Sequence, residues 1–206
     1  EAALKKAPVF DGHNDVPEQL RSRTGDMVGD FDFNDTTGTA RPDATPPVQA
    51  MHTDIQRLRK GHVGAQFWSV WVTTNQSEPE AVRSVIEQID VIKRLIARYP
   101  KDLALVTTAD AVLAEEKRGR IAGLIGVEGG HSIGSSLAVL RQLHALGARY
   151  MTITHSKNTP WADSATDAPN SGGLADFGRD VVREMNRIGM IVDLSHVSEA
   201  TMKDVL

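Results

Sequence analysis

The sequence contains no cysteine. A disulfide framework, a cysteine-ligated zinc site and a thiol nucleophile are therefore excluded, and any bound metal must be held by histidines and carboxylates. A basic excess is also missing, because 23 Lys and Arg stand against 27 Asp and Glu, which is a formal net charge of −4. Nucleic-acid-binding proteins need a basic surface, so we expect no nucleic-acid partner.

Long hydrophobic runs are missing as well. The longest stretch without polar side chains is 121–127, whereas a membrane helix needs roughly 20 apolar residues, so we expect no membrane segment. With 206 residues, of which 40% are hydrophobic and 24% charged, the chain has the composition of a globular protein with one sizeable core. We therefore predict a single domain over residues 1–206. The first residue is Glu1 rather than Met, so a removed signal peptide stays open.

Short apolar runs alternate with amphipathic stretches along the chain, which is the pattern of an α/β protein with a parallel sheet. The expected strands are 8–12, 63–72, 103–107, 121–127, 150–154 and 190–194, and the expected helices are 51–60, 79–99, 109–118, 135–146, 174–188 and 198 onward. Thr108 before one helix, and Gly147 and Gly189 after two others, are suitable caps. The polar segments 21–48 and 158–173 are predicted to be long loops.

Five or six βα units are visible, whereas a (β/α)8 barrel has eight strands and roughly 250 residues. Residues 200–206 stop within a helical pattern, without a cap. We therefore predict a TIM-type (β/α)8 barrel whose C-terminal part is missing from this chain.

Histidine and acidic residues gather where the predicted strands end. Such residues follow four different strands, and they are His13, Asp15, Glu128, His155 and His196. Since the carboxyl ends of parallel barrel strands open on one face, we expect these side chains to converge. Glu128 follows an apolar run, so its carboxylate must be paired, protonated or metal-bound if it is buried. Its two oxygens can bridge two cations, which would activate a shared water and polarise a carbonyl under attack.

Other interpretations of single motifs stand beside this one. Segment 130–134 matches the G-x-S-x-G pattern of a nucleophilic serine, with Ser132 as nucleophile and with Asp163 or Asp193 and His196 as partners. Two residues intervene between the strand and this motif, and the other strand-end ligands would be left unexplained. Taken alone, Asp15 or Asp163 would be an ordinary loop residue or helix cap. We expect His131 to cap the turn after Glu128.

Six segments together resemble the membrane (renal) dipeptidases, a family of zinc peptidases with an amidohydrolase-like barrel. They are DGHNDVP (11–17), GAQFWS (64–69), LIGVEGGHS (124–132), TITHS (152–156), NTPWAD (158–163) and DLSHVS (193–198). The segments follow one another in the family's order and span nearly the whole chain.

The resemblance implies a binuclear zinc dipeptidase, in which a metal-bridging hydroxide attacks the peptide bond of a dipeptide. It implies that His13 and Asp15 hold one zinc, that Glu128 bridges both, and that His196 holds the second. His155 is expected to contact the substrate near the scissile carbonyl. The catalytic residues would then be Glu128, His155 and Asp15.

The resemblance also implies that Trp161 and Asp163 join His155 in binding substrate. The family's pattern continues with a further His, an Arg and an Asp that have no counterpart before Leu206, so we expect a polypeptide ending there to be inactive. Lys157 stands where vertebrate members have a cysteine. A disulfide-linked dimer is excluded, and a non-covalent homodimer stays open. A bacterial-type soluble enzyme, exported to the periplasm or cytoplasmic, is favoured.

Two alternatives to the dipeptidase remain at this stage. One is a serine hydrolase of the α/β-hydrolase type built on Ser132, which would need no metal. The other is a non-catalytic barrel of the dipeptidase family, which would keep metal ligands without turning over a substrate. Zinc content separates the first alternative from the dipeptidase, and turnover separates the second.

Overall fold

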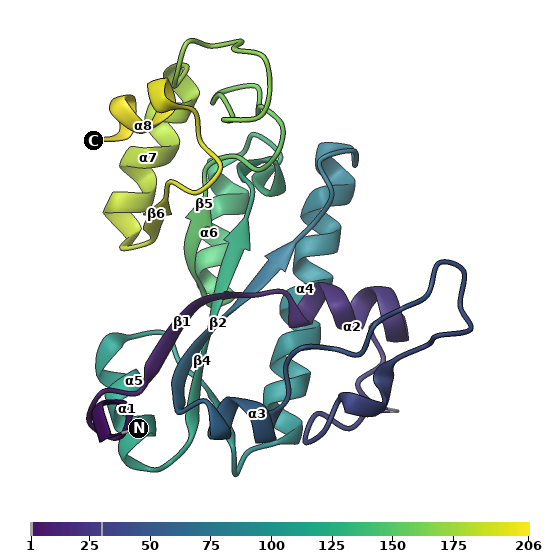
Figure 1. Ribbon diagram of the computed structural model, residues 1–206. Coiled ribbons are helices and arrows are strands. Elements are labelled where there is room, and N and C mark those ends of the chain that lie inside the picture. The colour runs from purple at the N-terminus through teal and green to yellow at the C-terminus, as the bar shows by residue number, and fades with distance from the viewer. Residues whose placement is uncertain (1, 30) are drawn as a thin grey trace. The chain divides into compact units, whose positions relative to one another are not determined.

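The computed structural model describes residues 2–29 and 31–206 (Figure 1). These residues form two compact units. The first unit comprises the described residues up to Trp68 together with Val91–Gly123, and the second comprises Ser69–Asp90 and Leu124–Leu206. Three elements contribute residues to both units: β2 (Val63–Trp71), α4 (Glu78–Arg98) and β4 (Ile121–Glu128). The expectation of one domain over residues 1–206 stays a prediction.

The first unit begins with a short helix and contains the first parallel strand pair. Its further elements are α1 (Ala2–Lys6), β1 (Val9–Asn14), α2 (Val16–Thr24), η1 (Thr37–Thr39), α3 (Ile55–Lys60), β3 (Leu103–Leu105) and α5 (Ala109–Lys117). Strand β1 pairs with β2, and β3 pairs with β4, both in parallel. Trp68 lies at the centre of this core, and a Cβ on Gly123 would lie 2.7 Å from its Nε1 atom. A larger residue at position 123 would therefore displace the indole ring.

The second unit contains the elements that follow β4. They are η2 (Gly130–Ile133), α6 (Leu137–Ala145), β5 (Ala148–Thr152), α7 (Asp176–Ile188), β6 (Ile191–Asp193) and α8 (Glu199–Val205). Strand β5 pairs in parallel with both β4 and β6. Helix α7 contacts α6 and β6, and α6 contacts β5. All eight residues of β4 are buried, as expected for a parallel strand with both faces covered.

The predicted parallel α/β arrangement is confirmed, since every expected strand and helix forms. Thr108 caps α5, where its hydroxyl oxygen accepts a hydrogen bond from the Ala111 N–H at 3.2 Å. Gly189 ends α7 with a φ of +75°, a conformation that favours glycine. Gly147 follows α6 with a φ of +116°. The caps therefore act where the sequence places them.

Two differences from the prediction concern α3, which starts later, and α2, which was not predicted. Helix α3 begins at Ile55 instead of residue 51, because the Asp54 carboxylate caps it and accepts a hydrogen bond from the Arg57 N–H at 2.8 Å. Helix α2 occupies Val16–Thr24, so the long loop predicted to start at residue 21 begins later. Pro17 in the first turn and Gly25, left-handed with φ +59°, delimit α2.

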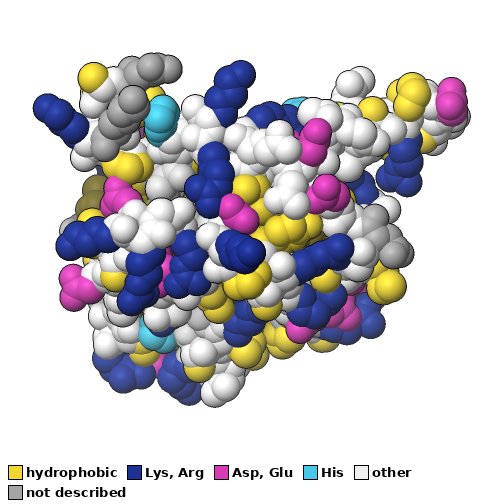
Figure 2. Space-filling view, turned by 90° about the horizontal axis from the view of Figure 1, so that it is seen from below, with side chains coloured by type: hydrophobic (Ala, Val, Ile, Leu, Met, Phe, Trp, Pro, Cys, Tyr) yellow, Lys and Arg dark blue, Asp and Glu magenta, His cyan; other side chains and the backbone are white. Residues whose placement is uncertain are grey.

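The surface carries charges of both signs. Figure 2 shows one face, on which Lys and Arg side chains lie among acidic, hydrophobic and uncharged ones. In the part of the chain that the structure describes, no helix combines the length and the apolar character that crossing a membrane requires.

Candidate metal centre

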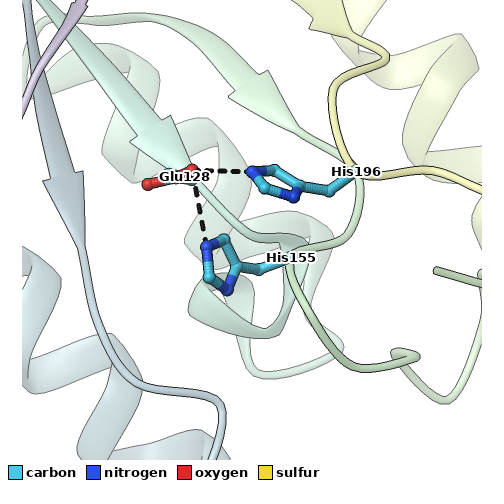
Figure 3. Close-up of side chains that lie close together, drawn as sticks. All are labelled: Glu128, His155 and His196. Atoms are coloured by element: carbon cyan, nitrogen blue, oxygen red, sulfur yellow. Dashed lines mark hydrogen bonds and ion pairs between the residues drawn. The ribbon is translucent and has the colours of Figure 1, made fainter. Parts of the chain in front are cut away.

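Three of the predicted site residues come together at the strand ends of the second unit (Figure 3). Glu128 is the last residue of β4, and its carboxylate is buried. The Glu128 Oε1 atom lies 3.2 Å from His196 Nε2 and 3.6 Å from His155 Nε2. The two imidazole rings are 4.5 Å apart between centroids. Two imidazole nitrogens therefore face one carboxylate oxygen.

These three side chains fit a zinc ion by their donor atoms and by their spacing. Zinc takes imidazole nitrogen and carboxylate oxygen at 2.0–2.2 Å, so two ligands of one tetrahedral ion lie about 3.4 Å apart. The separations of 3.2 Å and 3.6 Å bracket that value. The longer one exceeds the range of a hydrogen bond. The group is therefore spaced as metal ligands are, and its histidines are partly open to solvent.

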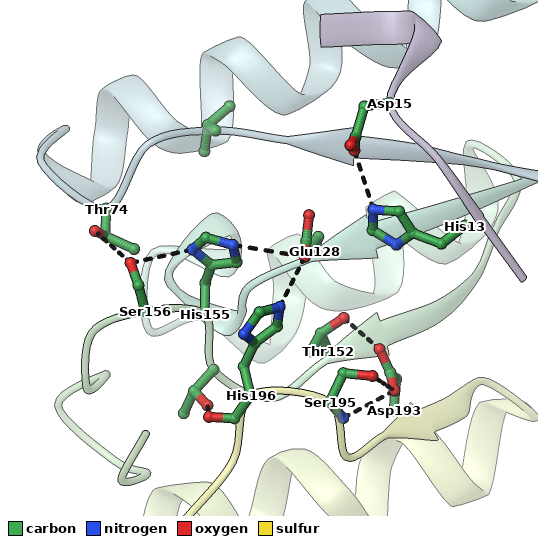
Figure 4. A network of polar contacts seen from close by, with 12 residues as sticks. His13, Asp15, Thr74, Glu128, Thr152, His155, Ser156, Asp193, Ser195 and His196 are labelled. Atoms are coloured by element: carbon green, nitrogen blue, oxygen red, sulfur yellow. Dashed lines mark hydrogen bonds and ion pairs between the residues drawn. The ribbon is translucent and has the colours of Figure 1, made fainter. Parts of the chain in front are cut away.

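His155 is oriented by hydroxyl groups behind its ring. Its Nδ1 atom lies 3.2 Å from Ser156 Oγ, which lies 3.5 Å from Thr74 Oγ1 (Figure 4). The Trp71 ring packs against the imidazole at a centroid distance of 5.5 Å. A partner on Nδ1 fixes which nitrogen is available for a metal or a substrate, and here Nε2 points at Glu128.

His196 reaches the site from a tight turn after β6. Asp193 organises this turn: its Oδ1 atom accepts hydrogen bonds from the Ser195 N–H at 3.0 Å and the Ser195 hydroxyl at 2.8 Å. Its Oδ2 atom accepts one from the Thr152 hydroxyl at 2.6 Å (Figure 4). His196 itself has a φ of +65°, which is uncommon for a residue with a side chain. The turn thereby directs the imidazole toward Glu128.

The turn after Glu128 is held by His131. Gly129 has a φ of +98°, and a Cβ there would lie 2.5 Å from the His131 ring. His131 Nε2 lies 3.2 Å from the Val72 carbonyl oxygen. Burial lowers the pKa of His131, although the hydrogen bond to Val72 opposes this shift. A neutral imidazole with its proton on Nε2 donates to that carbonyl, so among the described residues the side chain ties the turn to Val72 and makes no capping hydrogen bond to the turn itself. The expected role as a cap of the turn is therefore not seen.

His13 and Asp15 form a pair of their own in the first unit. His13 Nε2 lies 3.0 Å from Asp15 Oδ1, and both side chains are exposed. They line a cleft of about 440 Å³, which is also lined by His52 and Thr53. The Asn14 side-chain amide donates to the Thr53 hydroxyl at 2.9 Å, which ties the cleft wall to the end of β1. The spacing of this pair also suits two ligands of one ion.

Ser132 does not have the surroundings of a nucleophile. Its side chain is completely buried, and its hydroxyl oxygen has no hydrogen-bond partner among the described residues. A nucleophilic serine needs a base within hydrogen-bond reach and access to substrate. His196, the base of that hypothesis, faces Glu128 instead. The structure therefore does not support the serine-hydrolase alternative.

Asp163 lies inside the loop that follows β5, with 1% of its surface exposed. Its carboxylate accepts hydrogen bonds at 2.8–3.2 Å from four consecutive backbone N–H groups, those of Asn170, Ser171, Gly172 and Gly173. Burial raises the pKa of Asp163, but these backbone hydrogen bonds outweigh it and hold the pKa below its usual value. The carboxylate thus organises the loop, and its contact with substrate stays a prediction.

Trp161 is a core residue in this structure, with 1% of its surface exposed. Its ring covers Gly130, where an added Cβ would lie 2.5 Å from the indole Cη2 atom. The Phe177 ring packs edge-on against the indole at a centroid distance of 5.9 Å. A Cβ on Gly178 would lie 2.4 Å from the Trp161 carbonyl oxygen. Trp161 therefore joins η2 to α7, and its contact with substrate stays a prediction.

Several residues that shape the site were not singled out from the sequence. Asp193 was considered only as a partner of Ser132, and no role was assigned to Thr154 or Ser164. Thr154 and Asp193 lie inside the motifs TITHS and DLSHVS, so polar residues beside strand-end histidines were the available signal. Ser164 gave no such signal, because its contacts depend on how the loop folds back.

We expect Asp163→Asn to lower the free energy of unfolding at pH 7 by about 1–3 kcal/mol, because an amide offers one acceptor and its NH₂ group faces backbone donors.

The pKa of Asp163 is lowered in the folded state. Its stabilising contribution is therefore present above the unfolded pKa of about 3.9 and lost as pH falls through the folded pKa. Urea unfolding at pH 7 and pH 3 should show the larger loss on acidification in the unsubstituted protein. Asp180→Asn, on exposed α7 surface, is the control, and equal stabilities at pH 7 would contradict the assignment.

Two solved structures with a similar fold are described as metallopeptidases. A metallopeptidase from Rhodobacter sphaeroides, solved with a phosphinate mimic of the dipeptide L-Ala-D-Ala, matches with a TM-score of 0.80 at 23% identity, over 96% of this chain and 61% of that one. A dipeptidase of family M19 matches with a TM-score of 0.78 at 24% identity, over 96% and 59%. The fold is therefore that of a partial TIM-type barrel, as predicted.

Sequence comparison identifies the family. The model of the membrane dipeptidases (peptidase family M19) matches residues 1–206, and the chain belongs to this family of metallopeptidases. Dipeptidase 3 of Macaca fascicularis is 43% identical over 211 residues, and that of Rattus norvegicus is 43% identical over 210. Each match covers 100% of this chain and 40% of the relative. The chain thus spans about 40% of the length of these relatives, and the resemblance seen in the six motifs is confirmed.

Proposed function

We propose that the chain forms part of a binuclear zinc dipeptidase, which hydrolyses the peptide bond of dipeptides. The observation that carries this proposal is the buried Glu128 carboxylate, one oxygen of which faces Nε2 of both His155 and His196, in a chain of the membrane dipeptidase family. A dipeptide substrate is supported by the family and by the relatives named Dipeptidase 3.

In this proposal Glu128 holds both zinc ions, His196 holds one of them, and His13 and Asp15 hold the other. His13 and Asp15 lie at and just beyond the carboxyl end of β1, and Glu128 lies at that of β4. In a barrel of parallel strands these ends open on one face. Two zinc ions held there would activate a water at neutral pH and would polarise the carbonyl under attack. The burial of Glu128 strengthens its interaction with such cations.

His155 has a different role in this proposal, which is to bind the substrate beside the scissile carbonyl. The Ser156 hydroxyl, 3.2 Å from His155 Nδ1, can donate to that nitrogen. Nε2 then carries the proton and can donate a hydrogen bond to a substrate oxygen. His155 is therefore placed to stabilise negative charge that develops on that oxygen.

The proposal is tested on the protein expressed from its whole reading frame, by elemental analysis for zinc and by hydrolysis of a set of dipeptides. We expect close to two zinc ions per chain and measurable turnover. His155→Ala should keep the zinc and lose at least about 100-fold in turnover, since it removes one oxyanion donor. Ser132→Ala should change neither the zinc content nor the turnover.

Absence of zinc after growth and purification with zinc present would overturn the proposed function. Zinc without turnover of any dipeptide would favour the non-catalytic barrel of the same family. Loss of zinc in His155→Ala would make His155 a ligand instead of a substrate contact. A non-covalent homodimer and the location of the protein stay predictions.

A further inference from the structure

The main-chain carbonyl of His196 accepts hydrogen bonds from several groups. The Thr154 hydroxyl donates to it at 3.0 Å, and the Ala165 N–H donates to it at 2.8 Å. The Ser164 hydroxyl lies 3.3 Å from the same oxygen. His196 has a φ of +65°, a conformation that persists only where the surroundings hold it in place. These donors supply that support.

The main-chain carbonyl of His155 accepts a hydrogen bond from the loop 158–173, which also contains Ala165. Ser164 Oγ lies 2.6 Å from the His155 carbonyl oxygen, and because a hydroxyl has one proton, this closer carbonyl receives it. Thr154, which holds His196, is the residue directly before His155. Each histidine carbonyl thus accepts a hydrogen bond from a hydroxyl, that of Thr154 for His196 and that of Ser164 for His155. We call Thr154 and Ser164 the hydroxyl clamp.

The hydroxyl clamp is closed to solvent and anchored at its base. Thr154 is 0% exposed and Ser164 is 2% exposed, so water cannot readily take the place of either hydroxyl. The Ser164 N–H donates to the side-chain carbonyl of Asn158 at 2.7 Å. The Ser198 N–H donates to the Asp163 carbonyl at 2.9 Å. The loop 158–173 is therefore hydrogen-bonded to the segment that carries His196.

We propose that Thr154 and Ser164 are positioning residues, which lock the backbones of His155 and His196 together so that both imidazoles face one oxygen of Glu128 before any metal binds. The ring orientations are set by neighbours of the side chains, such as Ser156, but the separation of the two rings depends on the backbones that the clamp joins. Preorganised ligands bind a metal more tightly, because less ordering is required on binding. This inference rests on the proposed function in that it takes zinc as the metal.

The test compares Thr154→Val and Ser164→Ala in the protein expressed from its whole reading frame. Thr154→Val removes a hydroxyl at nearly constant volume, and Thr154→Ser keeps the hydroxyl. Zinc affinity is measured by competition with a chromophoric chelator, and the melting temperature is measured on the same metal-free samples. We expect zinc affinity to fall about 10- to 100-fold in Thr154→Val, which frees the backbone of the proposed ligand His196, and to be restored in Thr154→Ser. Ser164→Ala frees the backbone of His155, the proposed substrate contact, so it should keep the zinc affinity and lower dipeptide turnover about 10-fold, measured with zinc at saturation. Val181→Ala, in the buried face of α7, should lower the melting temperature and leave zinc affinity unchanged.

Unchanged zinc affinity in Thr154→Val, or unchanged turnover in Ser164→Ala, with zinc bound by the unsubstituted protein, would overturn the hydroxyl clamp and leave the proposed function in place. An equal fall in affinity in Val181→Ala would also overturn it, because stability alone would then explain the effect. Failure of the unsubstituted protein to bind zinc would instead overturn the proposed function.

Discussion

Glu128→Gln is expected to remove most of the bound zinc and to lower dipeptide turnover by at least about 1,000-fold, since the metal ions contribute several kcal/mol to stabilising the transition state. The substitution keeps the size of the side chain, but it replaces a charged carboxylate by an amide with one oxygen. The oxygen that faces both His155 and His196 would then carry little negative charge or be exchanged for an NH₂ group. Zinc content and turnover should be measured on the same preparation.

Glu78→Gln is the matched control for this prediction. The Glu78 carboxylate accepts a hydrogen bond from the Ser135 hydroxyl at 2.7 Å and lies at the start of α4. The same chemical change there should leave zinc content and turnover as they are. A Glu128→Gln protein with two zinc ions per chain and normal turnover would show that this carboxylate is not the bridge.

Much of the fold could be predicted, because buried parallel strands are continuous apolar runs and α/β helices carry caps that are visible in the sequence. Strand β4 is the clearest case, since residues 121–127 are apolar and every residue of the strand is buried. Helix α2 was not predicted because its second half falls in the polar segment 21–48, which has the composition of a loop. Its signals, Pro17 near the start and Gly25 at the end, become informative once the helix is known.

The candidate site could be predicted in outline, because histidines and carboxylates stand directly after strands whose ends meet at one edge of a parallel sheet. The structure places Glu128, His155 and His196 together. The hydroxyl clamp could not be predicted, because Thr154 and His196 are far apart in sequence and Ser164 reaches the His155 carbonyl only after its loop has folded back. The same holds for Asp163, whose four backbone donors come from residues 170–173.

Trp161→Ala is expected to lower the free energy of unfolding by about 3–5 kcal/mol, the usual loss for a large aromatic side chain removed from a core. The indole packs against Gly130, and the Phe177 ring meets it edge-on at 5.9 Å. Gly130 has no side chain with which to fill the space that the indole leaves. A loss of this size is a large part of the 5–15 kcal/mol that stabilises a typical protein. Urea unfolding of the metal-free protein measures it.

Trp161→Phe separates a core role from substrate binding. Phenylalanine keeps an aromatic ring against Gly130 and should retain more of the stability than alanine, with an unchanged KM for dipeptides. If the indole instead contacts the substrate, as the motif NTPWAD suggests by resemblance, Trp161→Phe should raise KM while unfolding stays nearly normal. Leu113→Ala, at a side chain that is 54% exposed on α5, should change stability by less than about 0.5 kcal/mol. Because Trp161 is 1% exposed, we expect an unchanged KM in Trp161→Phe. The indole packs against Gly130 in the turn after Glu128, so its removal should affect turnover only through that turn.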